Sequence, residues 1–213
     1  MFRDRLGLAV VHLRSGVPGE GVLGDDAIRA VASDDPGRTV ASRYLDPREP
    51  GAIGAEDLAV VPAVGWRPDD PAFEPVWAEI EARGARVLTR TGVLVAGAGS
   101  SSLGDPLAWD AVCRRFPRMR LQLCGAGGAV GYEAAARMIA VHPSVRADVS
   151  GSGMRALDRW LRLGVDVDWA RVAWGNDGHP VTYPANLTLL VDTLDRHGAG
   201  GLLHRLLRPS AGW

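Results

Sequence analysis

The chain has 213 residues, of which 46% are hydrophobic, and its formal net charge is −1. This length and composition suit one soluble domain over 1–213, and the balanced charge gives no case for nucleic-acid binding. No apolar run reaches the ~18 residues of a membrane span and the N-terminus lacks the apolar core of a signal peptide, so we expect a cytoplasmic protein without a membrane partner.

The sequence contains no lysine, so all 24 basic residues are arginine. This excludes Schiff-base chemistry, which needs a lysine amine, and it excludes a carbamylated lysine bridging two metal ions. Cys113 and Cys124 fall in a predicted helix and a predicted buried strand. We therefore expect two buried thiols and no disulfide.

Strand and helix patterns alternate from the start of the chain. The first predicted strand, 6–13, is a nearly continuous apolar run, as in a buried parallel strand. A helix over 25–33 follows and begins with two acids, which favour a helix N-terminus. Strands over 38–45 and 58–64 come next, and Pro62 weakens the second of these.

The rest of the chain repeats this alternation. A helix opens at Asp70-Pro71 and ends before Gly84. The remaining predicted strands are 86–89, 119–124, 145–149 and 171–174, and the remaining helices are 105–116, 132–141, 154–163, 186–197 and 202–207. Seven strands alternating with helices predict a parallel α/β fold and favour a (β/α) barrel. No Gly-x-Gly-x-x-Gly fingerprint follows the first strand, which weakens a dinucleotide-binding fold.

The last predicted strand runs into the turn Trp174-Gly175-Asn176-Asp177-Gly178-His179. Barrel enzymes place their chemistry on loops at the carboxyl ends of strands. Asp177 and His179 are therefore the candidate catalytic acid/base pair, since an imidazole exchanges protons near pH 7. The alternatives are an acid that only shapes the turn and a surface histidine.

Several segments, in order, resemble landmarks of the amidohydrolase superfamily. They are DDPAFEPVWAEI (69–80), Thr91-Gly92 after a strand, FPRMRL (116–121) before a Gly-Gly pair, HPSVRADVSG (142–151) and WGND (174–177). The nearest branch holds 2-pyrone-4,6-dicarboxylate lactonase and the aminocarboxymuconate-semialdehyde-type decarboxylases. The resemblance implies a TIM barrel that hydrolyses C–O or C–N bonds or cleaves C–C bonds, often with a bound zinc.

The resemblance also implies a ligand set, from which this chain departs. The family has a His-x-His on its first strand, a histidine ending the fifth, another ending the sixth, and an aspartate ending the eighth. Strand 6–13 aligns with the family's second, so we expect a TIM-like barrel lacking the first strand. Arg90 and Gly125 stand in the places of two histidines, and only Asp177 remains. One carboxylate does not hold a catalytic zinc and a guanidinium repels a cation, so we predict no metal and no other cofactor.

Four residues are candidates for binding a small anionic substrate. Arg90 would bind a carboxylate or phosphate through its forked guanidinium, or would pair with Asp177. His12, Trp66 and Asp148 lie in or near predicted strand ends. For them the alternatives are a buried hydrogen-bonded histidine, a core tryptophan and a solvated acid. Structural roles are expected for His142, His197 and His204.

Three functions fit this reading. The first is a metal-independent hydrolase or lyase acting on a small carboxylated or lactone-like compound. The second is a non-catalytic pseudoenzyme that binds a ligand or partner. The third, which the sequence favours least, is a metal protein with ligands such as His12, His179 and Cys124. Because a barrel without one strand exposes two edges, we also expect the gap to be closed by an N-terminal rearrangement, by a second copy of the chain in a homo-oligomer, or by a protein partner at the open edge.

Overall fold

The computed structural model describes residues 11–14, 25–34, 39–93, 100–176 and 182–207. Within these ranges there are seven strands, in the order that the sequence predicts. They are β1 (Val11–Arg14), β2 (Thr39–Tyr44), β3 (Asp57–Val60), β4 (Arg86–Arg90), β5 (Arg120–Cys124), β6 (Val145–Asp148) and β7 (Val172–Ala173).

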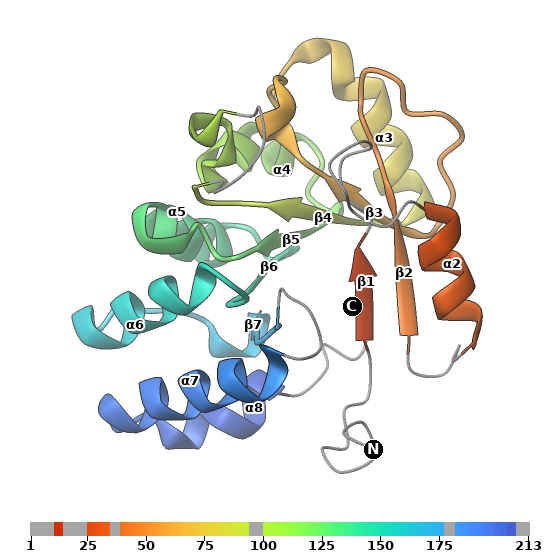
Figure 1. The fold of residues 1–213 in the computed structure, drawn as a ribbon. Helices are drawn as coiled ribbons and strands as arrows, with labels where there is room; N and C mark the ends of the chain where they lie inside the picture. Colours follow the sequence, from red (N-terminus) through yellow and green to blue (C-terminus); the bar gives the residue numbers. More distant parts are fainter. Residues whose placement is uncertain (1–10, 15–24, 35–38, 94–99, 177–181, 208–213) are drawn as a thin grey trace.

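The seven strands form one sheet whose spatial order is their order in the chain. Each neighbouring pair is parallel. Sequential parallel strands joined by helical crossovers are the pattern of a TIM barrel, whose complete form has eight strands. Figure 1 shows the sheet curving, with the helices arranged around its outer side. The prediction of a parallel α/β fold of the barrel type is confirmed.

The helices lie between the strands, as predicted. They are α2 (Asp25–Asp34), α3 (Glu74–Arg83), α4 (Asp110–Arg115), α5 (Gly128–Val141), α6 (Gly153–Leu163), α7 (Tyr183–Arg196) and α8 (Leu203–Leu207). Short 3₁₀ turns are η1 (Pro62–Val64), η2 (Pro71–Phe73), η3 (Ser101–Gly104), η4 (Pro106–Trp109), η5 (Trp169–Arg171) and η7 (Gly200–Leu202). Among the described helices, none is long and apolar enough to cross a bilayer.

Several element boundaries differ from the prediction; the helix expected over 105–116, for example, is a helix only over Asp110–Arg115 and starts with the 3₁₀ turn η4. The strand expected over 58–64 ends at Val60, because Pro62 cannot donate to a strand ladder and instead opens η1. Helix α5 begins at Gly128 and not at Tyr132. The strand expected over 171–174 is reduced to β7, and residues 6–10 of the first predicted strand lie outside the described residues.

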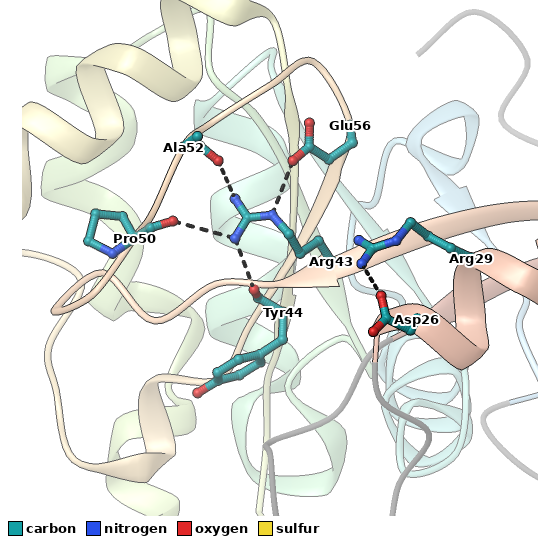
Figure 2. A network of polar contacts seen from close by, with 7 residues as sticks. All are labelled: Asp26, Arg29, Arg43, Tyr44, Pro50, Ala52 and Glu56. Atoms are coloured by element: carbon teal, nitrogen blue, oxygen red, sulfur yellow. Dashed lines mark hydrogen bonds and ion pairs between the residues drawn. The ribbon is translucent and has the colours of Figure 1, made fainter.

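An arginine on β2 fastens the segment that leads to β3. Figure 2 shows the Arg43 guanidinium directed at the 50–56 segment. Its Nε donates to Glu56 Oε1 at 3.1 Å, and its Nη2 donates to the carbonyl oxygen of Ala52 at 3.1 Å. These contacts hold a segment without regular structure against the outer side of the sheet.

The apolar core lies between the sheet and the helices. Alternate residues on β3 to β6 point into it, and Leu58, Val87, Leu121 and Val145 are fully buried. Since side chains of a strand alternate between its two faces, the intervening residues point to the inner, concave face of the sheet.

The inner face of the sheet carries polar side chains beside apolar ones. Gln122 Nε2 donates to Asp148 Oδ2 at 2.8 Å, and Arg86 Nε donates to Asp57 Oδ1 at 3.1 Å, so these side chains share that face. The interior of a TIM barrel is usually filled by bulky branched apolar side chains. This sheet instead presents charged and amide groups, which can bind polar ligands.

Candidate functional site

The candidate site lies at the edge where the parallel strands end, as the sequence predicts. The register places Arg90 beside Cys124, Cys124 beside Asp148, and Asp148 beside Ala173. We call these four residues the strand-end row. It brings together two of the predicted substrate-binding residues, Arg90 and Asp148.

Arg90 is the exposed member of β4. The four residues before it are buried. It shares the inner face with Arg86 and Leu88, because they occupy alternate positions. A guanidinium carries five donors and no acceptor, so this end of β4 suits a carboxylate or phosphate oxygen and not a cation.

Asp148 joins two loops at the strand ends. Its side chain is 7% exposed. The carboxylate accepts hydrogen bonds from Gln122 Nε2 at 2.8 Å, from the amides of Gly125 and Ser150 at 3.1 Å each, and from the Ser150 hydroxyl. Four donors compensate the burial of a carboxylate. These contacts give Asp148 a structural role, and its role in substrate binding stays a prediction.

Thr91 holds the loop after β5 from the opposite side. Its hydroxyl donates to the carbonyl oxygen of Cys124 at 3.0 Å and accepts from the amide of Gly127 at 2.9 Å. Neither Thr91 nor Ser150 is among the predicted site residues. In the sequence, each of them closely follows a predicted strand end. Many residues without a site role do the same, so this feature does not distinguish Thr91 or Ser150.

The loop after β5 is crowded, and its backbone is strained for a non-glycine residue, where the resemblance implies a histidine. Gly125 has a φ of +82°, and Ala126, Gly127 and Gly128 also have positive φ values. A Cβ at Gly125 would lie 3.3 Å from the carbonyl oxygen of Thr91 and 3.4 Å from Ser152 Oγ. Backbone conformation and crowding therefore both oppose a ligating side chain here.

The described residues do not fit a catalytic zinc. In the ranges described above, no group of three or more His, Cys, Asp or Glu side chains converges. Burial raises the pKa of Cys113 on α4 to about 12, so this thiol stays protonated and is not a zinc ligand. Asp177, His179 and the side chain of His12 lie outside what the structure describes, so the predicted absence of a metal stays a prediction.

Trp66 is buried in an aromatic cluster. It is 4% exposed. Its ring centroid lies 5.8 Å from that of Phe73, 6.1 Å from Trp77 and 6.4 Å from Trp109. These are the contacts of a core tryptophan, the alternative left open above, and a substrate-lining role for Trp66 stays a prediction.

Two histidines make structural contacts with acids on neighbouring helices. His142 is 6% exposed, and its Nε2 lies 2.8 Å from Asp110 Oδ1. His197 Nε2 lies 2.9 Å from Asp158 Oδ1. These contacts agree with the expectation that both histidines serve the fold. They connect α4 to the end of α5 and α6 to the end of α7.

A cavity of about 570 Å³ lies beside the strand ends, between η3, η4 and the outer side of α5. Its lining residues are Gly92, Ser101, Ser102, Gly104, Asp105, Pro106, Leu107, Gly127, Val130, Gly131, Glu133, Ala134 and Arg137. None of the predicted site residues is among them. The cavity is therefore separate from the strand-end row, although both adjoin the loops after β4 and β5.

A model of the amidohydrolase family matches residues 24–199. The chain belongs to the amidohydrolase family. The match includes β2 to β7 and the strand-end row, so the resemblance seen in the sequence is confirmed. No curated protein sequence matches the chain.

Solved structures of TIM-barrel and amidohydrolase proteins resemble this fold. An uncharacterized TIM-barrel protein of Bordetella bronchiseptica is 15% identical, with a TM-score of 0.68 over 97% of this chain and 81% of that one. The 5-carboxyvanillate decarboxylase of Novosphingobium aromaticivorans is 13% identical, with a TM-score of 0.58 over 98% and 77%. The dihydroorotase of Campylobacter jejuni is 11% identical, with a TM-score of 0.55 over 85% and 67%. At these identities the similarity concerns the fold.

Proposed function

We propose that this amidohydrolase-family protein binds a small carboxylated compound at the strand-end row and acts on it as a hydrolase or lyase without the family's metal. The observation that carries the proposal is Arg90. It places an exposed guanidinium on the inner face at a strand end where the resemblance implies a metal-binding imidazole. When a side chain that binds a metal ion is replaced by one that is itself a cation, the position favours an anion and no longer a metal ion.

In this proposal Arg90 orients the substrate by a two-point contact with its carboxylate. Asp177 and His179 transfer the proton, His179 as the general base near neutral pH. Both lyase and hydrolase chemistry stay within the proposal, since a decarboxylase and a dihydroorotase are among the proteins of similar fold. The substrate is a carboxylated ring or lactone, because such compounds have the carboxylate group that Arg90 would bind.

The second candidate function is non-catalytic ligand binding, and Asp148 favours it. This acid of the strand-end row is buried and already accepts four hydrogen bonds. It therefore has little capacity to act as a general base. Catalysis would depend on Asp177 and His179, whereas binding would need only Arg90.

The test is turnover and binding of a panel of carboxylated lactones and aromatic carboxylates, measured on protein dialysed against EDTA. Arg90→Ala is expected to weaken binding by about 10- to 100-fold, since a charged contact is worth about 1.5–3 kcal/mol, and Arg90→Lys should restore part of the loss. Asp177→Asn should abolish turnover and keep binding. Arg162→Gln is the control, because it removes one exposed arginine from the last turn of α6, at the end of the helix far from the strand-end row.

The outcomes separate the candidates. Turnover that persists in EDTA and disappears in Asp177→Asn supports the enzyme. Binding that depends on Arg90 without any turnover supports the non-catalytic alternative. Turnover that appears only after zinc is added back contradicts the metal-independent proposal.

A further inference from the structure

The cavity of about 570 Å³ beside α5 is a groove with two walls. One wall is a face of α5, on which Gly127, Val130, Ala134 and Arg137 follow one another at the spacing of successive helical turns. From Gly127 to Arg137 this wall is about 15 Å long. The turns η3 and η4 form the other wall. The groove therefore has the size of a site for a small organic molecule, which is roughly 300–1,000 Å³.

Direct contacts hold the two walls together. A Cβ on Gly131 would lie 3.1 Å from Pro106 Cδ, so η4 packs on the first turns of α5 without an intervening side chain. Further along, Nε2 of His142, which follows α5, lies 2.8 Å from Oδ1 of Asp110, the first residue of α4. Because both contacts belong to the fold itself, the groove is formed without a ligand, as small-molecule sites usually are.

Apolar side chains are exposed in this groove. Within the described ranges five large apolar side chains are exposed, and two of them line the groove from opposite walls. They are Val130, which is 73% exposed, and Leu107, which is 46% exposed. A third, Val93, directly follows Gly92 of the lining. Exposed apolar side chains are normally scattered singly, so their gathering here indicates a surface that binds an apolar group.

The charged residues of the lining are Asp105, Glu133 and Arg137. Asp105 Oδ1 accepts from the amide of Leu107 at 2.9 Å, and Glu133 Oε1 accepts from the Tyr132 hydroxyl at 3.1 Å. Arg137 is exposed, and no hydrogen bond or ion pair from a described residue reaches its guanidinium. Of the three charged groups, the cation is therefore the one that a ligand would pair.

We propose that the groove binds an apolar compound, about as long as two fused rings, that carries one carboxylate. The rings contact Val130 and Leu107, and the carboxylate accepts hydrogen bonds from the forked guanidinium of Arg137. Arg137 lies seven residues beyond Val130, or about 10 Å of helix, and helical side chains lean toward the N-terminus. The carboxylate therefore lies at one end of the rings.

This site is distinct from the one under the proposed function and does not rest on it. No residue of the strand-end row lines the groove. The groove lies between helical elements, whereas the strand-end row lies on the inner face of the sheet. Because both sites would take a carboxylate, the test has to distinguish them.

The test is isothermal titration of the full chain with naphthoate, naphthamide and naphthylmethylamine. These compounds share two rings and carry an anionic, a neutral and a cationic group. We expect saturable binding of naphthoate, about three- to tenfold tighter than that of naphthamide, because the contact with Arg137 is an exposed one. The same titration on Arg90→Ala should give the same affinity, since the strand-end row takes no part.

Two variants locate the ligand, each with a matched control. Ala134→Phe places a ring in the groove and should weaken naphthoate binding about tenfold or more, whereas Ala140→Phe, at an exposed position of α5 outside the lining, should not. Arg137→Gln should remove the preference for naphthoate over naphthamide and leave naphthamide binding unchanged. Arg162→Gln, at an exposed arginine of α6, should keep that preference. Because Arg137 is exposed, this comparison stays decisive if Ala134→Phe does not fold.

Several results would overturn the proposal. Without saturable binding of naphthoate there is no such site. Equal binding by Ala134→Phe and Ala140→Phe would place the compound outside the groove, and an unchanged preference in Arg137→Gln would show that Arg137 does not hold the carboxylate. Tightest binding of naphthylmethylamine would mean that the acids of the lining select a cation. Loss of naphthoate binding in Arg90→Ala would assign it to the strand-end row, which would support the proposed function and not this site.

Discussion

At the scale of single residues, Thr89 and Thr91 both have a buried hydroxyl group, but only that of Thr91 is hydrogen-bonded among the described residues. Thr89 is fully buried on β4, and its Oγ1 has no hydrogen-bond partner among the described residues. Thr91 is also buried, but its hydroxyl makes hydrogen bonds to the backbone of Cys124 and Gly127. An unused buried hydroxyl destabilises a protein, whereas a paired one stabilises it.

Thr89→Val is therefore expected to leave the free energy of unfolding unchanged or to raise it by about 1 kcal/mol, because it removes an unsatisfied hydroxyl at nearly constant volume. Thr91→Val should lower it by about 1–3 kcal/mol, since the amide of Gly127 loses its acceptor. Urea unfolding of both variants measures the difference. Equal losses in the two variants would contradict the hydrogen bonding described for Thr91.

Some site residues can be placed from the sequence and others cannot. The end of an apolar run locates Arg90 at a strand end, and parallel pairing then places it next to Cys124. Two of the four donors of Asp148 come from Gln122 and Gly125, more than 20 residues earlier in the chain, so no local pattern reveals that its carboxylate is already used. The burial of Trp66 likewise depends on rings contributed by α3, η2 and η4.

At the scale of elements, apolar runs predict the strands well because parallel strands are buried on one face and flanked by helices. The predicted element boundaries are wrong where a glycine or a proline starts or ends an element. Helix α5 starts at Gly128, where glycines with positive φ turn the chain, and glycine's low helix propensity conceals that start in the sequence. Pro62 ends β3 early because it cannot donate a ladder hydrogen bond.

Close contacts between glycine backbones join the loops next to the site. The amide of Gly92 donates to the carbonyl oxygen of Gly104 at 2.8 Å, and a Cβ on Gly104 would lie closer than 3.0 Å to the carbonyl oxygen of Gly92. Gly104→Ala should therefore lower the free energy of unfolding by about 1–3 kcal/mol through overpacking. Urea midpoints provide the measurement.

Gly201→Ala is the matched control for this prediction. Nothing lies within 4 Å of a Cβ at Gly201. Its effect should stay within about 0.5 kcal/mol, as for surface substitutions. If the two alanine variants unfold at the same urea concentration, the close packing of Gly92 on Gly104 does not contribute to stability.

At the scale of the whole molecule, carboxylates paired with cations make stability depend on pH. Hydrogen bonds from Arg114 and His142 lower the pKa of Asp110 from its ordinary value of 3.8, and a hydrogen bond from His197 lowers that of Asp158. A carboxyl whose pKa is lower in the folded state than in the unfolded state stabilises the fold at any pH above its unfolded-state pKa. That contribution is lost as the pH falls through the folded-state pKa.

We therefore expect the free energy of unfolding to fall as the pH drops from about 5 to about 2. Asp158→Asn should make this dependence shallower, because the carboxylate that pairs with His197 is gone. Asp192→Asn, at an exposed acid on α7, serves as the control. Chemical unfolding across the pH range checks the prediction, and an unchanged slope in Asp158→Asn would contradict it.

The ends of the sheet bear on assembly. Within the described residues the sheet order runs from β1 to β7, and each of these two strands has one neighbour. Strand edges invite pairing with another chain, so we expect a second copy of this chain or another protein to cover one of them. Light scattering after size-exclusion chromatography should show a mass above that of a single chain. A stable monomer would contradict self-association.

The central claim is that Arg90 and the crowded Gly125 have replaced a metal site of the amidohydrolase family. Elemental analysis of the purified chain, before and after zinc supplementation followed by gel filtration, tests it most directly. We predict far less than one zinc per chain in both samples. About one tightly held zinc per chain, as in a catalytic site with three protein ligands, would contradict this account and return the protein to metal-dependent chemistry with other ligands.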